Sequence, residues 1–340
     1  MLKIIVESHI PYIKGRLEPW AQVEYLDTAA ITPQAVRDAD ALLVRTRTRC
    51  NAQLLDGSRV SFIGTATIGT DHIDLGYCAR RGITVANAPG CNAPAVAQWV
   101  LSAIGHWMDL RGVTNAHSLT LGVVGVGHVG SIVARWARQL GLGVLLCDPP
   151  RAQREGADGF CTMQQLVARS TIITFHTPLA AGGDYPTVHL CSEAMLAQAT
   201  QCRLLINAAR GPIADNEALL RWPGDVAIDC WEHEPAISLG LLQKAFVATP
   251  HIAGYSSEGK QRGTAMVIEA LNRHFGISAQ PPHVAAPAGG AANVTFSSIM
   301  DSYNPLTDTA RLKAAPQDFE QQRNHYPLRP EVPCTLQVTP

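Results

Sequence analysis

Three side chains of complementary chemistry lie on successive predicted loops in the second half of the chain. Arg210 and Glu234 each follow a hydrophobic segment, and His251 lies in the sequence TPHIAGY. An arginine keeps its positive charge and binds anions, whereas a histidine exchanges protons near neutral pH. Together the three residues predict proton transfer at an anionic substrate, although each alone is also compatible with a structural role. The two hydrophobic segments are 204–209 and 226–230.

One reaction that uses this set is hydride transfer between a 2-hydroxy acid and a nicotinamide. The reaction needs a cation that holds the substrate carboxylate and a base that takes the hydroxyl proton as the hydride leaves the carbon. Arg210 suits the first role and His251 the second. A carboxylate such as Glu234 fixes the tautomer of the histidine and favours the imidazolium that forms. We therefore expect the three residues to be catalytic.

A glycine-rich motif in the middle of the chain independently predicts a dinucleotide cofactor. Gly125, Gly127 and Gly130 form the pattern G-x-G-x-x-G directly after the apolar segment 119–124, and a pattern typical of an amphipathic helix follows. Glycine at these positions allows a tight turn and a close approach to the pyrophosphate, which binds at the helix N-terminus. Three glycines also occur in ordinary loops, but the strand and helix around them favour cofactor binding. The motif includes two further predicted contacts, His128 and Val129.

The residues after the motif indicate which dinucleotide is bound. Asp148 ends the predicted strand 144–147, 18 residues beyond Gly130, where a carboxylate accepts hydrogen bonds from the adenosine ribose. This position favours NAD over NADP, although Arg151 could accommodate a 2′-phosphate. Thr177 follows the predicted strand 171–175 at the same sheet edge and is a further candidate for cofactor contact.

The N-terminal part of the chain predicts a separate α/β domain with its own candidate anion site. Arg45, Arg47 and Arg49 alternate with threonines and would share one face if the backbone is extended. Guanidinium groups and the hydroxyl of Thr46 suit a carboxylate or phosphate, whereas a solvated surface is the simpler explanation. The loop 64–74 is rich in hydroxyl residues and is either a ligand loop or only a turn. The strands expected here are 2–6, 23–26, 41–44, 61–64 and 84–86.

Composition argues against several classes of protein. The chain of 340 residues is 46% hydrophobic and 16% charged, which is ordinary for a globular protein with two domains. A net charge of −1 gives no case for binding nucleic acid or a membrane surface. The nine cysteines lack C-x-x-C spacing, which predicts neither a disulfide framework nor a metal site. With no signal-peptide or membrane-span pattern, reduced thiols indicate a cytoplasmic protein.

Taken together, these motifs resemble the D-isomer-specific 2-hydroxyacid dehydrogenases. The similarity rests on GVGHVG with Asp148, on HTPL, NAARGP, DCWEHEP and TPHIAGY, and it extends to about residue 285. The resemblance implies NAD as the cofactor, Arg210 as the substrate-binding residue, His251 as the acid/base and Glu234 as its support. The cofactor contacts that it implies are Asp148, Thr177, Ala208, Ala209, Arg210, Asp229 and Gly254.

The loops resemble a narrower group within this family, which acts on a phosphorylated 2-hydroxy acid. The similar segments are VRTRT, FIGTATIGTDHID, APGCNAPAV, LLCDPPRA and PHIAGYSSEGKQRGT. The resemblance implies oxidation of 4-phospho-D-erythronate in pyridoxal 5′-phosphate (vitamin B6) biosynthesis, with substrate contacts from Thr46, Thr67 and Tyr255. We further expect Arg45 to help bind the phosphate.

The expected architecture is α/β with two domains and a C-terminal segment. Residues 1–92 and 256–284 would form a discontinuous flavodoxin-like substrate domain, and 93–255 a doubly wound, Rossmann-type NAD-binding domain. Residues 285–340 would form a linker and a short α+β extension, for which the resemblance implies dimerisation and hence a homodimer.

Two helices carry further expectations. Residues 309–326 are predicted to be helical, capped by Asp308 and interrupted near Pro316. The apolar stripe of the predicted helix 94–108 is typical of either a core or a subunit interface.

Two other functions are compatible with the sequence. The chain could act on another 2-hydroxy acid, such as glycerate or phosphoglycerate. It could also resemble the NAD-sensing corepressors that use this fold as a binding module without turnover. The complete set of Arg210, Glu234 and His251 favours an enzyme.

Overall fold

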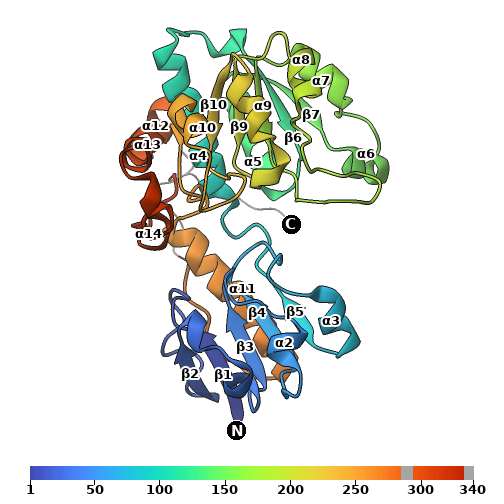
Figure 1. Cartoon of the computed structure of the whole chain (residues 1–340), viewed down its shortest axis with the longest axis vertical. Helices are drawn as coiled ribbons and strands as arrows, with labels where there is room; N and C mark the ends of the chain where they lie inside the picture. The colour runs from blue at the N-terminus through green and yellow to red at the C-terminus, as the bar shows by residue number, and fades with distance from the viewer. Residues whose placement is uncertain (285–293, 333–340) are drawn as a thin grey trace. The chain divides into compact units, whose positions relative to one another are not determined.

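The chain divides into two compact units in the computed structural model, which describes residues 1–284 and 294–332. Unit 1 comprises Met1–Asn92 and Ser256–Ala286, and unit 2 comprises Ala93–Tyr255 and Pro287–Pro340. Each unit is built on a parallel β-sheet that is covered by helices (Figure 1). Strands that alternate with helices along the chain give this α/β architecture, as the sequence predicts.

Unit 1 contains a five-stranded parallel sheet with the order β2-β1-β3-β4-β5, which is the order of flavodoxin-like folds. The interior strands β3 and β4 are buried at every residue, which explains why ALLV and FIGT show no alternation of polar and apolar side chains. The five predicted strands are confirmed to within two residues at each end. They are β1 (Leu2–Glu7), β2 (Ala21–Leu26), β3 (Ala41–Val44), β4 (Phe62–Thr65) and β5 (Thr84–Ala86).

A long helix, α11 (Ser257–Phe275), covers one face of the unit 1 sheet. Its residues Val267 and Leu271 are fully buried in a cluster with side chains of β1, β3 and β4. A Cβ on Gly64 would lie 2.6 Å from Val267 Cγ1, so glycine allows this close approach. The opposite face is covered by three short helices, namely α1 (Pro33–Val36), α2 (Ala52–Leu55) and α3 (Leu75–Arg80).

Unit 2 contains a six-stranded parallel sheet with the order β11-β10-β9-β8-β6-β7. The chain runs from β6 outward to β7 and then crosses back to β8, which lies on the other side of β6. This reversal is the topological switch point at which doubly wound sheets bind their ligands. The strands are β6 (Thr120–Val124), β7 (Gly143–Cys147), β8 (Ile172–Phe175), β9 (Leu204–Asn207), β10 (Asp225–Ile228) and β11 (Val247–Ala248).

Helices cover both faces of the unit 2 sheet. On one face α4 (Ala93–Leu110) and α5 (His128–Gln139) form a core that includes the fully buried Trp99 and Trp107. The stripe of Val96, Val100 and Ile104 on α4 is buried within this unit, so the structure confirms the core alternative for it. The opposite face carries α7 (Met163–Arg169), α8 (Glu193–Gln198), α9 (Asn216–Arg221) and α10 (Leu239–Lys244), while α6 (Pro149–Glu155) follows β7.

The C-terminal extension packs within unit 2. Its helices are α12 (Phe296–Ser302), α13 (Pro305–Ala314) and α14 (Phe319–Asn324), which Figure 1 shows in orange to dark red. Both α12 and α13 pack against α4. Ile299 joins the core that contains α4, and Phe319 joins the core on the opposite face of the sheet. The extension is therefore an integral part of the fold of this unit.

The prediction of a helix over 309–326 that Asp308 caps is wrong in its details. Asn304 is the cap of α13, and Pro305 occupies the first turn, where its missing N–H costs nothing. Asp308 lies one turn further on, where its carboxylate accepts hydrogen bonds from the hydroxyls of Tyr303 and Tyr326. The predicted interruption near Pro316 is confirmed.

Helix α13 also covers the edge of the unit 2 sheet. The two-residue strand β11 is the edge strand, and α13 packs directly against it. The amide of Ala248 donates a hydrogen bond to Thr309 Oγ1 at 3.0 Å. A side chain of the extension thus pairs an amide that an edge strand would otherwise present to solvent.

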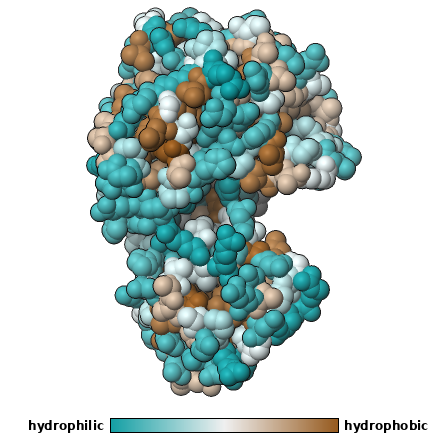
Figure 2. Space-filling view, viewed as in Figure 1, coloured by the Kyte–Doolittle hydropathy of each residue, from teal (hydrophilic) through white to brown (hydrophobic). Residues whose placement is uncertain are grey.

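The surface is predominantly polar on the face that Figure 2 shows, and hydrophobic residues occur there in small separated groups. Within the described part of the chain, no helix has the length and apolar character needed to cross a membrane.

Candidate active site

The glycine-rich loop between β6 and α5 has the geometry of a phosphate-binding turn. Gly125 has a positive φ of 85°, and a Cβ there would lie 2.8 Å from the backbone of His176 and Thr177. A Cβ on Gly130 would collide with the carbonyl oxygen of Gly125. A Cβ on Gly127, in contrast, would meet no atom within 4 Å. The loop therefore needs two of its glycines for its own packing and leaves open space at the third, where a pyrophosphate fits at the N-terminus of α5.

Asp148 lies at the end of β7, beside this loop. Its Oδ2 accepts a hydrogen bond from the amide of Val126 at 2.8 Å, and its Oδ1 accepts one from the amide of Arg151 at 3.0 Å. The Arg151 guanidinium donates to Val126 O and to Glu155, each at 2.7 Å. Because protein groups engage this guanidinium, Arg151 gives no support to a 2′-phosphate site, and Asp148 suits a ribose hydroxyl.

Two residues after β8 face the switch point. Thr177 Oγ1 is buried and has no hydrogen-bond partner among the described residues, which suits a polar ligand at this position. His176 bonds through Nε2 to Thr174 Oγ1 at 3.0 Å, and burial lowers the pKa of its imidazole to about 3. His176 is therefore neutral at physiological pH, and it is not a suitable acid/base. The glycine loop, Asp148 and Thr177 together fit a bound NAD.

Arg210 follows β9 on a loop that Asn207 orders. The buried Asn207 side chain donates to Arg210 O at 3.0 Å and accepts from the amide of Ala209 at 3.2 Å. A Cβ on Gly211 would collide with the carbonyl oxygen of Trp231, so the loops after β9 and β10 touch at this point. Arg210 Nη1 donates to Ala209 O at 2.8 Å. These contacts fix the direction of the backbone at the predicted substrate-binding arginine, next to Ala208 and Ala209.

Glu234 and His251, the predicted acid/base pair, are in direct contact. His251 Nδ1 lies 2.9 Å from Glu234 Oε2 and 3.1 Å from Oε1. The amide of Trp231 donates to Oε1 at 2.8 Å and fixes the carboxylate. Burial raises the pKa of Glu234, but the charge and hydrogen bond of His251, with the Trp231 amide, hold it below its usual value. The ionised carboxylate therefore places the proton of a neutral imidazole on Nδ1 and leaves Nε2 able to accept a proton.

The His251 loop is held by Asp229, which is buried at the end of β10. Asp229 Oδ1 accepts hydrogen bonds from Thr249 Oγ1 at 2.6 Å and from the Ile252 amide at 2.7 Å, and Oδ2 accepts one from the Ala253 amide at 3.0 Å. Burial raises the pKa of Asp229, whereas these bonds and the charge of His251 oppose the rise. Asp229 thus anchors the loop 249–253, a role that the sequence does not reveal. A direct contact of Asp229 or Gly254 with NAD stays a prediction.

Two residues near the pair escape prediction from the sequence. Arg323 on α14 places Nη1 at 3.8 Å from Glu234 Oε2 and hydrogen-bonds the Tyr255 hydroxyl. Cys230 Sγ, a Glu234 oxygen and a His251 nitrogen lie within 4.8 Å of one another. Burial raises the pKa of the Cys230 thiol well above its usual value, and this thiol donates to Ala209 O. A protonated thiol is a poor metal ligand, so the arrangement favours proton transfer over metal binding.

The substrate-binding candidates of unit 1 lie on the loops after β3 and β4. Arg45 binds Glu7 through its amide at 2.8 Å, and its Nη1 donates to His9 O at 3.3 Å. Thr46 is exposed, and the hydroxyl of Thr67 lies 2.6 Å from that of Thr65. The condition that 45–49 is extended is not met, because residues 46 and 47 form a turn. The three arginines therefore do not line one face of a strand.

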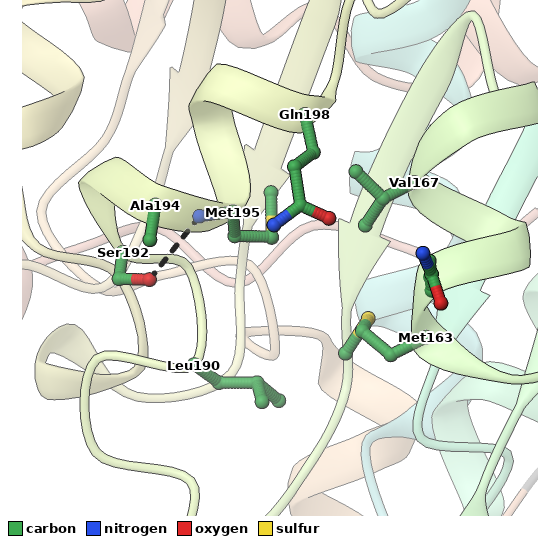
Figure 3. A pocket seen from close by; sticks show the side chains of 8 residues that line it. Met163, Val167, Leu190, Ser192, Ala194, Met195 and Gln198 are labelled. Carbon is green, nitrogen blue, oxygen red and sulfur yellow. Dashed lines mark hydrogen bonds between the residues drawn. The ribbon is translucent and has the colours of Figure 1, made fainter.

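A pocket of about 470 Å³ lies between α7 and α8 in unit 2 (Figure 3). Ser192 lines it, but its hydroxyl is used as the cap of α8 and accepts a hydrogen bond from the Met195 amide at 3.3 Å. No predicted site residue lines this pocket, which is not part of the candidate site. Its lining residues are Met163, Gln164, Val167, Leu190, Ser192, Ala194, Met195 and Gln198.

The fold and the site together define a class of protein. Residues 92–253 match the family model of the D-isomer specific 2-hydroxyacid dehydrogenase, NAD binding domain. The chain belongs to the D-isomer specific 2-hydroxyacid dehydrogenase family. It is an NAD-dependent dehydrogenase, as the sequence predicts.

Individual relatives within this family match the chain over nearly its full length. The chain is 45% identical to the erythronate-4-phosphate dehydrogenase of Bacteroides fragilis, and the match covers 97% of each chain. It is 41% identical to the erythronate-4-phosphate dehydrogenase of Marinobacter nauticus, with 96% of this chain and 92% of that one covered. Among solved structures, the D-lactate dehydrogenase of Aquifex aeolicus in complex with NAD and lactic acid has a TM-score of 0.65 at 22% identity, over 81% of this chain and 96% of that chain. This last similarity confirms the fold.

Proposed function

We propose that this dehydrogenase oxidises 4-phospho-D-erythronate to (R)-3-hydroxy-2-oxo-4-phosphobutanoate, as a step in pyridoxal 5′-phosphate biosynthesis. The observation that carries the reaction is the pairing of His251 with Glu234 at 2.9 Å on the loops that follow the NAD-binding sheet. The choice of substrate is supported by 45% identity over 97% of both chains to a protein named erythronate-4-phosphate dehydrogenase.

The proton transfer follows from the geometry of the pair. NAD, when bound, supplies the acceptor for the hydride that leaves C2. His251 Nε2 takes the proton of the C2 hydroxyl, because Nδ1 is occupied by the carboxylate of Glu234. The imidazolium that forms is stabilised by Glu234, and the side chain of His251 is 28% exposed, so its proton can pass on to solvent.

The remaining predicted residues bind the substrate. Arg210 holds the carboxylate of the 2-hydroxy acid, for which a planar guanidinium is well suited. Thr46, Thr67 and Tyr255 contact the substrate, and Arg45 contributes to binding the phosphate. This assignment is supported by the anchored loop around Arg210 and by the placement of Thr46 and Thr67 after the parallel strands of unit 1.

Initial rates with three substrates test the proposal. The enzyme with NAD is expected to oxidise 4-phosphoerythronate with a kcat/KM at least about 100-fold above that for erythronate, because loss of the phosphate removes a charge-assisted contact of about 3 kcal/mol. A lower kcat/KM is also expected for 3-phosphoglycerate, which keeps the phosphate but is one carbon shorter, so that its phosphate and C2 cannot both occupy the same positions. Equal rates with and without the phosphate would contradict the substrate assignment. NADH binding without turnover of any 2-hydroxy acid would instead favour a sensing module, and the His251→Ala variant would then behave as the unchanged protein does.

We also infer that the protein is cytoplasmic and that it forms a homodimer. The eight cysteines of the described residues form no disulfide bond, which supports a reducing compartment, the cytoplasm. A homodimer stays a proposal that rests on the resemblance. Size-exclusion chromatography with light scattering tests it, and a mass near 36.5 kDa would indicate a monomer instead.

A further inference from the structure

Arg323 connects the C-terminal extension to the acid/base pair. Its side chain is only 17% exposed, and its Nη1 lies 3.8 Å from Glu234 Oε2 and 3.9 Å from Glu320 Oε1. The same guanidinium hydrogen-bonds the hydroxyl of Tyr255. One cation on α14 therefore contacts both the carboxylate that supports His251 and a predicted substrate contact.

The guanidinium stays charged in this position. Burial lowers the pKa of Arg323, but the contacts with Tyr255 and Glu234 raise it above the usual arginine value. Glu234 Oε2 is the oxygen that also lies 2.9 Å from His251 Nδ1, so the cation and the imidazole share one carboxylate oxygen. The charged and titratable groups around the pair include Asp229, Cys230, Arg210, Tyr255 and Arg323, and Glu320 contacts Arg323 from its own helix.

The effect of this cation on the proton transfer has a definite sign. Arg323 opposes the positive charge that His251 acquires, and it competes with His251 for the carboxylate. Asp229 and Glu234 act in the opposite direction, because their negative charges favour the imidazolium. The balance between these groups decides the pH at which His251 becomes a neutral base.

We propose that Arg323 is a positioning residue of the C-terminal extension that keeps His251 neutral at lower pH and orients Tyr255. The proposal rests on the proposed function, because it assigns a role toward His251 as the base. Loss of the cation favours the imidazolium. The acid limb of the kcat/KM profile for oxidation is then expected to move to higher pH by about one unit, which is the order of size for the removal of one nearby charge in a partly buried site.

Three variants test the proposal. Arg323→Gln removes the charge, Arg323→Lys keeps it, and Arg311→Gln is the matched control on the same extension, where the 52% exposed Arg311 pairs with Asp308. The expected results are an acid limb about one pH unit higher in Arg323→Gln and an unchanged limb in the other two variants. Arg323→Lys is expected to raise KM about threefold or more, because one ammonium group replaces a planar donor that serves both Glu234 and Tyr255.

A second readout does not depend on turnover. Diethyl pyrocarbonate reacts with neutral imidazole, and the tryptic peptide of residues 245–260 contains His251 as its single histidine. The rate of modification of this peptide, measured by mass spectrometry against pH, is expected to shift with the kinetic limb. This readout remains valid if the substrate assignment fails. Failure of the role proposed for Arg323 can therefore be distinguished from failure of the proposed function.

Two outcomes would overturn the proposal. The first is an Arg323→Gln enzyme that keeps the unchanged protein's pH dependence in both measurements, which would leave Arg323 with a packing role alone. The second is a shift of the same size in Arg323→Lys, which would show that the charge is not responsible. Arg323→Met, which also removes the charge and keeps an unbranched side chain, replaces the glutamine variant if thermal unfolding shows that the latter does not fold.

Discussion

At the scale of single residues, the site combines a strained backbone with a buried anchor. His251 has a φ of 57°, in the left-handed region, which costs a non-glycine residue about 1–2 kcal/mol. The hydrogen bonds of Asp229 to Thr249, Ile252 and Ala253 hold the loop on both sides of His251. The imidazole is thus directed at Glu234 by a loop that has little freedom to relax.

His176 predicts how the stability of unit 2 depends on pH. Burial lowers its pKa to about 3, below the value of about 6.5 for an exposed histidine, so the unfolded chain binds the proton more readily than the native protein. The contribution of the neutral His176 to the unfolding free energy is therefore fully present above pH 6.5, and it is lost progressively as the pH falls toward 3.

The loss is measurable by urea unfolding at pH 7 and pH 5. His176 is expected to account for about 1 to 2 kcal/mol of the decrease in unfolding free energy between these values. The His176→Asn variant lacks the titrating group, so its decrease is expected to be smaller by that amount. An equal decrease in both proteins would contradict the assignment.

At the scale of elements, different glycines of the loop between β6 and α5 serve folding and cofactor binding. Gly130→Ala is expected to lower the melting temperature by several degrees, because its Cβ collides with Gly125 O. Gly127 has a φ of −77°, and a Cβ at this position would have open space around it, so we expect the Gly127→Ala variant to fold normally. It is expected to weaken NADH binding about tenfold, because the methyl group enters the phosphate space.

The matched pair of alanine variants makes this test specific. Thermal unfolding and NADH fluorescence titration give the two quantities on the same samples. Unchanged NADH affinity in Gly127→Ala would place the pyrophosphate elsewhere. A large loss of stability in the same variant would show that the open space has another structural use.

The elements that the sequence predicts well are those whose signals are local. The strands β3 and β5 match the predicted bounds, because short apolar segments end at polar residues. The pairing of Glu234 with His251 was predictable because their loops meet at one edge of the sheet. Arg323 could not be predicted in this way, because its contact with Glu234 depends on how α14 packs against a distant loop. The turn at residues 46 and 47 could not be predicted for a similar reason, since the adjacent buried Thr48 bonds Glu7 on another strand.

At the scale of the whole chain, the extension is part of the stability of unit 2. Phe319 is fully buried in the core with α7, α8, α9 and α10. Phe319→Ala is therefore expected to reduce the unfolding free energy by about 3–5 kcal/mol. Leu239→Ala is the control, since Leu239 is 60% exposed, and we expect a change within about 0.5 kcal/mol.

Denaturant unfolding of the two variants checks this prediction. Equal midpoints would mean that α14 contributes nothing to the core. A midpoint that falls in Phe319→Ala alone would support one cooperative unit that includes residues 294–332.

The cover of β11 by α13 has a consequence for self-association. A short edge strand with unpaired amides can add a strand from another molecule and so begin an aggregate. The hydroxyl oxygen of Thr309 accepts a hydrogen bond from the Ala248 amide, and α13 packs over this edge. A chain that ends before residue 294 would expose β11 as an open edge together with the core surfaces that Ile299 and Phe319 cover, and we expect light scattering to show aggregates instead of a monodisperse protein. We therefore expect the extension to protect this sheet edge from self-association.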